Sequence, residues 1–119
     1  MSFRERVINV VQAVPHGKVV TYGQVALLAG APRAARHVGF VLRGLDQAQE
    51  YPWHRVVNAQ GKISTYRVGV GELQRALLEH EGIEFDGEER IDFRKYRWEP
   101  GQEWLDAHYA GPVRVAEEQ

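Results

Sequence analysis

The stretch TYGQVALLAGAPRAARHVGFVLRGL, residues 21–45, decides the fold of this chain. Thr21 is a typical N-cap, so a helix is expected over residues 22–29, and Gly30 is a typical residue for ending it. A second helix is expected over residues 33–45, after a proline of the kind that helix starts accommodate. Two helices joined by a tight glycine-containing turn match the helix-turn-helix pattern for binding in a DNA groove.

The second of these helices divides into an apolar face and a basic face at 3.6 residues per turn. The predicted buried face holds Val38, Val41, Leu42 and Leu45. The basic residues lie on another side, close enough together to face one partner: Arg33, Arg36 and Arg43. This pattern favours nucleic-acid binding, although many helical hairpins also carry arginines on their solvated side.

The flanking sequence predicts two more helices and a short β pair. Apolar residues recur at helical spacing over residues 3–14 and again over residues 72–80. The second of these helices is expected to place Leu73, Ala76, Leu77 and His80 on one face. Residues 55–57 indicate a short strand that ends in a turn, with residues 62–64 as its expected partner. The expected architecture is mainly α.

The last third of the chain is acidic and rich in aromatic residues. We expect it to fold back on the core through Phe85, Ile91, Phe93, Tyr96, Trp98 and Trp104. Residues 111–119 are expected to form a frayed tail. The length allows one compact core and is short for two domains, so a single domain is predicted over residues 1–110.

Charge is unevenly distributed along the chain, whose formal net charge is only −1. Residues 1–45 carry +5, whereas residues 70–119 carry −7. A basic front half is consistent with a nucleic-acid face, although an uneven solvated surface would give the same counts. The 119 residues include no cysteine, which excludes disulfides, thiolate metal sites and thiol nucleophiles. The histidines show no metal-ligand spacing, so neither a metal nor another cofactor is expected.

Four blocks in fixed order resemble the C-terminal DNA-binding domain of O6-alkylguanine-DNA alkyltransferases. The blocks are PHGKVVTYG at 15–23, AARHVG at 34–39, PWHRV at 52–56 and LLEHEG at 77–82. The resemblance implies a winged-helix-like, helix-turn-helix domain with a short β pair.

The reactive run of that family is Pro-Cys-His-Arg-Val, and Trp53 stands here in the place of the cysteine. An indole cannot replace the thiolate that accepts the alkyl group, so alkyl transfer by the family route is excluded. The chain resembles the alkyltransferase-like subgroup, in which tryptophan commonly takes this position. The resemblance implies a protein that binds the lesion without repairing it, and not an enzyme.

The resemblance also implies roles for residues that bind DNA and flip a nucleotide. Arg36 would fill the gap left in the stack, Tyr22 would press on the neighbouring phosphate, and Gly39 would allow close approach of the backbone. Arg33 and Arg43 belong to the same basic face. Phe40 follows where the family often has a small residue, which changes the expected groove fit.

The lesion pocket implied by the resemblance is formed by Tyr22, Trp53, Val56, Val57 and Tyr66. The backbone near the two valines would bind the guanine edge, and the indole would line the alkyl group and favour tolerance of large adducts. His54 and Glu81, which deprotonate the family's cysteine through a water, are expected as scaffold, with Arg55 holding the loop.

The predicted function is a non-catalytic sensor that flips O6-alkylguanine in double-stranded DNA and directs it to nucleotide excision repair proteins. We expect a cytoplasmic monomer, because the sequence has neither a membrane-spanning apolar run nor a signal-peptide layout. Two alternatives remain open. One is a generic helix-turn-helix regulator with a vestigial pocket, and the other is an enzyme that removes the alkyl group without cysteine, for example by hydrolysis.

Overall fold

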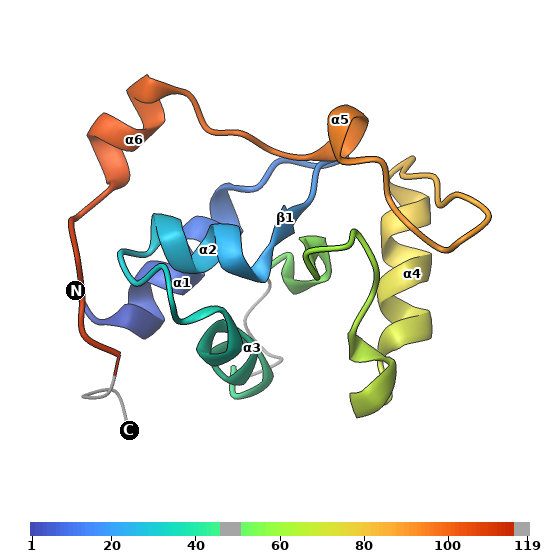
Figure 1. Cartoon of the computed structure of the whole chain (residues 1–119), viewed down its shortest axis with the longest axis horizontal. Coiled ribbons are helices and arrows are strands. Elements are labelled where there is room, and N and C mark those ends of the chain that lie inside the picture. The colour runs from blue at the N-terminus through green and yellow to red at the C-terminus, as the bar shows by residue number, and fades with distance from the viewer. Residues whose placement is uncertain (46–50, 116–119) are drawn as a thin grey trace.

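Three helices from the first half of the chain form the larger of two apolar cores. The computed structural model describes residues 1–45 and 51–115. In it, α1 (Phe3–Ala13), α2 (Tyr22–Leu28) and α3 (Ala35–Arg43) pack together, as Figure 1 shows. The fully buried side chains that these helices contribute include Phe3, Val7, Val11, Val25 and Val38.

The predicted helix-turn-helix arrangement is confirmed. Thr21 caps α2 with its hydroxyl, which accepts a hydrogen bond from the amide of Gln24 at 3.0 Å. The side chain of Gln24 accepts in return from the amide of Thr21 at 3.4 Å, completing a capping box. Gly30 has φ +91°, a left-handed conformation that glycine adopts readily, and it turns the chain toward α3.

The β pair is parallel and joins segments far apart in the sequence. β1 (Val20–Thr21) pairs with β2 (Val56–Val57), with Val20 opposite Val56. The predicted partner at residues 62–64 is wrong, because β2 pairs with β1 and residues 62–64 form no strand. The bond between the amide of Asn58 and the carbonyl of Lys62, 3.0 Å long, closes a turn. Both valines of β2 are fully buried, so their place is in the core beside β1.

The second core lies under α4 (Gly71–His80) and contains Val19, Val57, Leu78, Ile83, Ile91 and Tyr96. The predicted inner face of α4 is wrong, because Gln74 and Leu78 are buried, whereas Leu73 is 53% exposed. Gln74 is buried because its amide donates to the carbonyls of His54 and Val56, at 2.9 and 2.8 Å. Two short 3-10 helices, η1 (Trp53–Arg55) and η2 (Thr65–Val68), precede α4.

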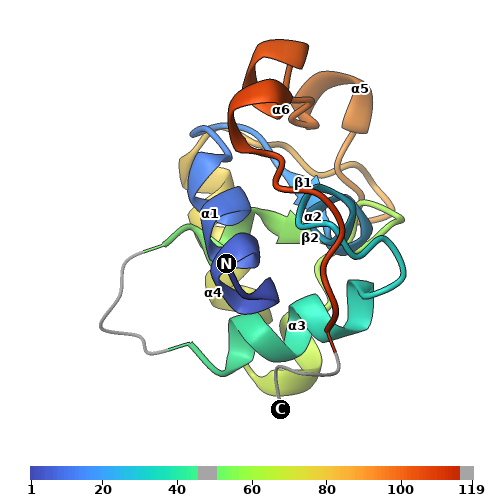
Figure 2. The same cartoon turned by 90° about the vertical axis from the view of Figure 1, so that its left-hand side faces the viewer.

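The C-terminal part of the chain folds back over the first core, as predicted. After α5 (Phe93–Tyr96), residues 97–115, here called the strap, include α6 (Gln102–His108) and run past α2 toward α3 (Figure 2). The amide of Trp98 donates to the carbonyl of Val19 at 2.8 Å, which fixes the beginning of the strap.

The end of the strap is also held in place. The amide of Val113 donates to the carbonyl of Gly30 at 3.0 Å, and the guanidinium of Arg6 donates to the carbonyl of Gly111. The predicted fraying from residue 111 therefore does not describe residues 111–115, because valine side chains there pack on the core. Residues 116–119 lie outside the described part. None of the helices described is long and apolar enough to cross a bilayer.

Candidate nucleic-acid interface

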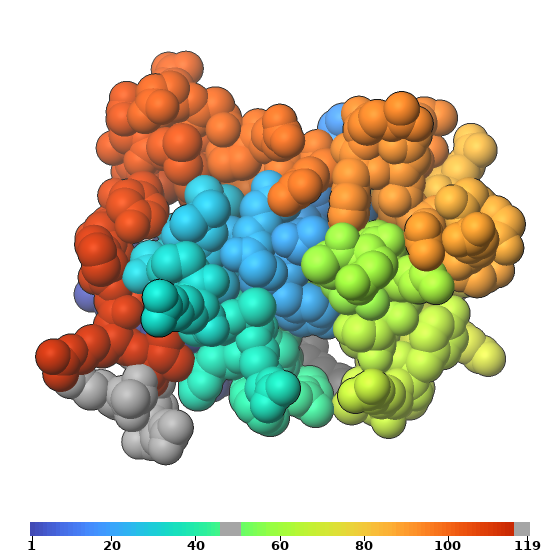
Figure 3. All heavy atoms as spheres, in the orientation of Figure 1, coloured from blue at the N-terminus to red at the C-terminus, as the bar shows by residue number. Residues whose placement is uncertain are grey.

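An open cleft separates α3 from the segments that follow residue 50. Its volume is about 1790 Å³, larger than the roughly 300–1,000 Å³ of a typical small-molecule pocket. Figure 3 shows the surface hollowed between α3 and the residues of η2 and α4. The cleft therefore has room for a nucleotide together with part of the strand that carries it.

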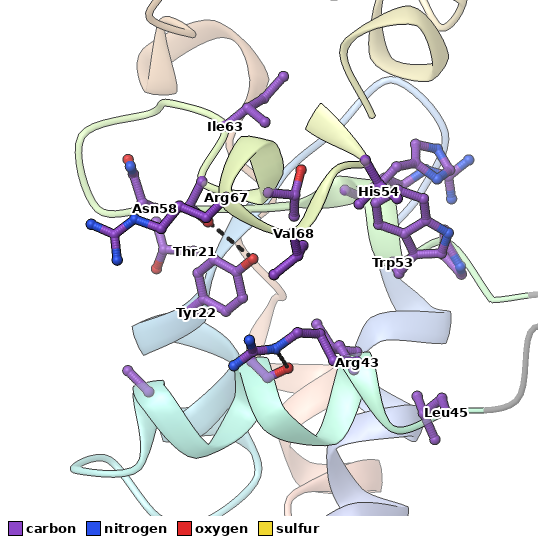
Figure 4. Close-up of a pocket in the computed structure, with 18 of the residues that line it drawn as sticks. Thr21, Tyr22, Arg43, Leu45, Trp53, His54, Asn58, Ile63, Arg67 and Val68 are labelled. Carbon is purple, nitrogen blue, oxygen red and sulfur yellow. Dashed lines mark hydrogen bonds between the residues drawn. The ribbon is translucent and has the colours of Figure 1, made fainter. Parts of the chain in front are cut away.

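The wall formed by α3 presents two of the three predicted arginines. Arg36 and Arg43 are exposed and line the cleft with Gly39 between them. The Nε of Arg43 donates to the carbonyl of Gly39 at 3.4 Å (Figure 4). Arg33 does not line the cleft, because it lies in the turn before α3 and not on the helix.

Tyr22 bridges the two walls of the cleft. It is the first residue of α2, and its ring lies 3.9 Å from the position that a Cβ on Gly39 would take. Its hydroxyl accepts a hydrogen bond from the hydroxyl of Ser64, at 3.3 Å, on the opposite wall. Figure 4 shows the phenol ring in the middle of the cleft.

Trp53 lies in the cleft at the start of η1 and is partly buried. Its indole meets the ring of His54 edge-on, with 6.1 Å between the ring centroids and an interplanar angle of 86°. One wall of the cleft is therefore aromatic, which suits a stacked base or an apolar substituent.

Glu81 holds the floor of the cleft from behind. Its carboxylate accepts from His54 Nε2 at 2.6 Å, from Arg55 Nη2 at 2.8 Å and from the amide of Gly17 at 2.8 Å. Arg55 also donates to the carbonyl of Val14 at 2.8 Å. Burial raises the pKa of Glu81, but these hydrogen bonds and the charge of Arg55 outweigh it and lower the pKa to about 2.

Of the other three predicted pocket residues, two lie outside the cleft and one lines it. Val56 and Val57 do not line the cleft, since their side chains are buried in the two cores and the carbonyl of Val56 accepts from Gln74. Tyr66 lines the cleft and is 53% exposed. Its ring lies directly over Gly71, where any Cβ would overlap it.

Sequence reasoning missed several residues that line the cleft opposite α3. They come from the loop after β2, from η2 and from α4, and they include Asn58, Ser64, Val68, Leu73 and Leu77. The polar residues among them indicate only a loop, and Leu73 and Leu77 were expected on the inner face of a helix, so neither signal shows that these side chains line a cleft. Among the described residues, no three acidic or histidine side chains gather in a way that could hold a metal ion.

A helix-turn-helix pair that faces an aromatic-lined cleft defines a DNA-binding domain. Residues 2–83 match the family described as "6-O-methylguanine DNA methyltransferase, DNA binding domain", and the chain belongs to this family. It is 50% identical over 97 residues to the DNA base-flipping protein of Escherichia coli K12, a match covering 82% of this chain and 74% of that protein.

Two further comparisons concern fission yeast. The chain is 39% identical over 104 residues to alkyltransferase-like protein 1 of Schizosaccharomyces pombe, covering 83% of this chain and 96% of that protein. It also resembles the structure of S. pombe Atl1 in complex with damaged DNA containing O6-carboxymethylguanine. The TM-score is 0.74 at 37% identity, and the match covers 82% of this chain and 95% of that one.

This member of the family departs from its methyltransferases at the reacting atom. The sequence contains no cysteine, and Trp53 takes the position of the alkyl acceptor. An indole carbon or N–H offers no nucleophile comparable to a thiolate. The chain is therefore not a cysteine alkyltransferase.

Proposed function

We propose that this protein is a non-catalytic damage sensor that flips an O6-alkylguanine out of double-stranded DNA and holds it in the cleft. One observation carries the proposal: Trp53 lines the cleft beside the hydrogen-bonded His54–Glu81–Arg55 frame, in a run that resembles the reactive run of the alkyltransferases. Support also comes from the S. pombe Atl1 structure, which contains damaged DNA.

Residues of the two walls of the cleft would make different contacts with the DNA when a nucleotide is flipped. Tyr22 would press on the phosphate beside the target nucleotide, and Arg36 would enter the stack and hydrogen-bond the orphaned base. Arg43 would bind a phosphate farther along the strand. The flipped base would then lie against Trp53 with its alkyl group on the indole, where stacking is worth on the order of 1–3 kcal/mol.

The hydrolytic alternative would depend on His54 and Glu81 to take a proton from water. Both carboxylate oxygens already accept hydrogen bonds, and a pKa of about 2 makes this group a weak base at neutral pH. His54 directs its Nε2 at the same carboxylate. These contacts fix the floor of the cleft, and recovery of the lesion as O6-methylguanine or as guanine in the test below separates a sensor from a hydrolase.

A sensor that leaves the lesion intact needs another system to remove it. We propose that nucleotide excision repair proteins receive the lesion, and that the acidic back half of the chain faces away from DNA and toward them. We propose that the protein acts as a monomer in the cytoplasm, on duplex DNA.

The test compares one duplex with and without a single O6-methylguanine at fixed salt, followed by nucleoside analysis of the recovered DNA. We expect tighter binding to the modified duplex and full recovery of O6-methylguanine. Equal binding to both duplexes would leave a generic helix-turn-helix regulator, and conversion of the lesion to guanine would show an enzyme. Trp53→Ala should reduce the preference for the lesion while largely keeping the affinity for the unmodified duplex.

A further inference from the structure

Phe40 is a large apolar side chain on the outer side of α3 that the proposed flipping mechanism does not use. It is 55% exposed, among the highest values for any large apolar residue of the chain. Single exposed apolar residues are common on protein surfaces, so exposure alone implies nothing. The position of Phe40 on α3 and the contacts of its ring indicate a role.

Helix geometry places Phe40 on the same side of α3 as the two arginines of the cleft. At about 100° per residue, it lies roughly 40° around the helix from Arg36 and 60° from Arg43. It also lies about 6 Å along the helix axis from Arg36, at a rise of 1.5 Å per residue. A DNA surface that receives both arginines therefore meets the phenyl ring as well.

A chain of aromatic contacts connects the ring of Phe40 to the core. Phe3 is fully buried and meets His37 edge-on at 5.8 Å, and His37 meets Phe40 edge-on at 6.0 Å. From the other side, the guanidinium carbon of Arg43 lies 4.9 Å from the centre of the Phe40 ring. These contacts limit the freedom of the ring before any partner binds, which lowers the entropic cost of burying it in an interface.

We propose that Phe40 is an apolar wedge that packs against deoxyribose and a base-pair step in the groove that α3 enters, which for wedge-inserting proteins is typically the minor groove. The inference rests on the proposed function, because it needs α3 to lie in the groove. Apolar wedges of this kind partly unstack a step and kink the duplex. With base pairs about 3.4 Å apart, Phe40 acts roughly two steps from the gap that Arg36 fills. Phe40 then strengthens binding to any duplex, while Tyr22 and Trp53 set the preference for the lesion.

The experiment measures affinity and DNA bending by energy transfer between the ends of two duplexes, unmodified and carrying O6-methylguanine. Phe40→Ala is expected to weaken binding to both duplexes about tenfold, as for losing the burial of roughly half a phenyl ring. The bend should decrease in both, and the affinity ratio between the duplexes should stay as in the wild type. Phe40→Leu should restore most of the affinity and of the bend.

Tyr109→Ala is the matched control, since Tyr109 is an aromatic residue of similar exposure, 44%, outside the cleft. It should leave affinity and bend unchanged. A flexible TA step placed two base pairs from the lesion, on either side, should improve binding of the wild type and not of Phe40→Ala. Thermal unfolding of each variant verifies that the fold is retained.

If Phe40→Ala kept the affinity and the bend of the wild type, the proposed wedge would be wrong. So would a loss confined to the modified duplex, because it would place Phe40 in the lesion pocket. If the wild type itself showed no preference for the lesion, the proposed function would fail, while a parallel loss with Phe40→Ala on both duplexes would still support the wedge.

Discussion

The carboxylate of Glu81 joins three segments that are distant in the sequence. It binds the amide of Gly17, the imidazole of His54 and the guanidinium of Arg55, and only 6% of its side chain is exposed. In a site built around a cysteine these contacts would serve proton transfer. Here they tie the loop before β1 and the helix η1 to the end of α4, which fixes the floor of the cleft.

The low pKa of Glu81 predicts how the stability of the protein depends on pH. Its pKa is lowered from 4.5 to about 2 by folding, so its stabilising effect is complete above about pH 4.5 and is lost as the pH falls toward 2. Glu81→Gln should lower the free energy of unfolding at pH 7 by about 3 kcal/mol, because Arg55 loses its counter-charge. The difference from the wild type should shrink steadily between pH 4.5 and pH 2.

Urea denaturation at a series of pH values measures both effects. Glu79→Gln provides the control, since Glu79 is about half exposed and its ion pair with Arg75 on α4 should be worth little. A pH-independent difference between Glu81→Gln and the wild type would contradict the proposed charge balance.

At the level of single elements, Gly30 connects the helix-turn-helix pair to the strap. Its φ of +91° disfavours other residues, and a Cβ there would overlap the carbonyl of Gly111. Gly30→Ala should therefore destabilise the protein by about 2 kcal/mol or more, through the left-handed backbone and the displaced strap together.

The control for Gly30→Ala is Gly69→Ala, which isolates the cost of the backbone. Gly69 has φ +85°, but nothing lies within 4 Å of where its Cβ would stand. Calorimetric unfolding should show the smaller loss for Gly69→Ala. Equal losses would mean that the contact between strap and turn contributes nothing to stability.

The elements of the fold differed in how far the sequence could predict them. The helices and the cap at Thr21 follow from local spacing and capping chemistry, which the chain carries within a few residues. The inner face of α4 could not be predicted, because the polar side chain of Gln74 is buried through hydrogen bonds to carbonyls of a distant segment. The parallel pairing of β2 with β1 likewise depends on contacts more than 30 residues apart.

The candidate site was predictable where it rests on short motifs. Tyr22, Arg36 and Trp53 come from three separate blocks, and the structure brings all three to one cleft. Arg33 and the two valines of β2 were expected there and lie elsewhere, because position in a motif does not fix the direction of a side chain. Of the wall contributed by η2 only Tyr66 was predicted, since a glycine-containing loop has no periodicity.

Over the whole molecule, the three tryptophans fall into two groups separated by α2. Trp53 lies in the cleft, whereas Trp98 and Trp104 meet edge-on in the strap, 5.3 Å apart between centroids. Figure 1 shows α6, which carries Trp104, on the side of α2 away from α4. The chain thus contains two sets of natural fluorophores, one at the proposed DNA site and one outside it.

Because the two groups of tryptophans are separate, their fluorescence can report which part of the protein responds to DNA. In a variant with Trp98→Phe and Trp104→Phe, the remaining indole emission should change when a modified duplex is added, because a base stacks on Trp53. In Trp53→Phe, the emission of the strap pair should stay constant during the same titration. A response from the strap pair would mean that the C-terminal segment moves when DNA binds, so each spectrum reports one end of the molecule without any added label.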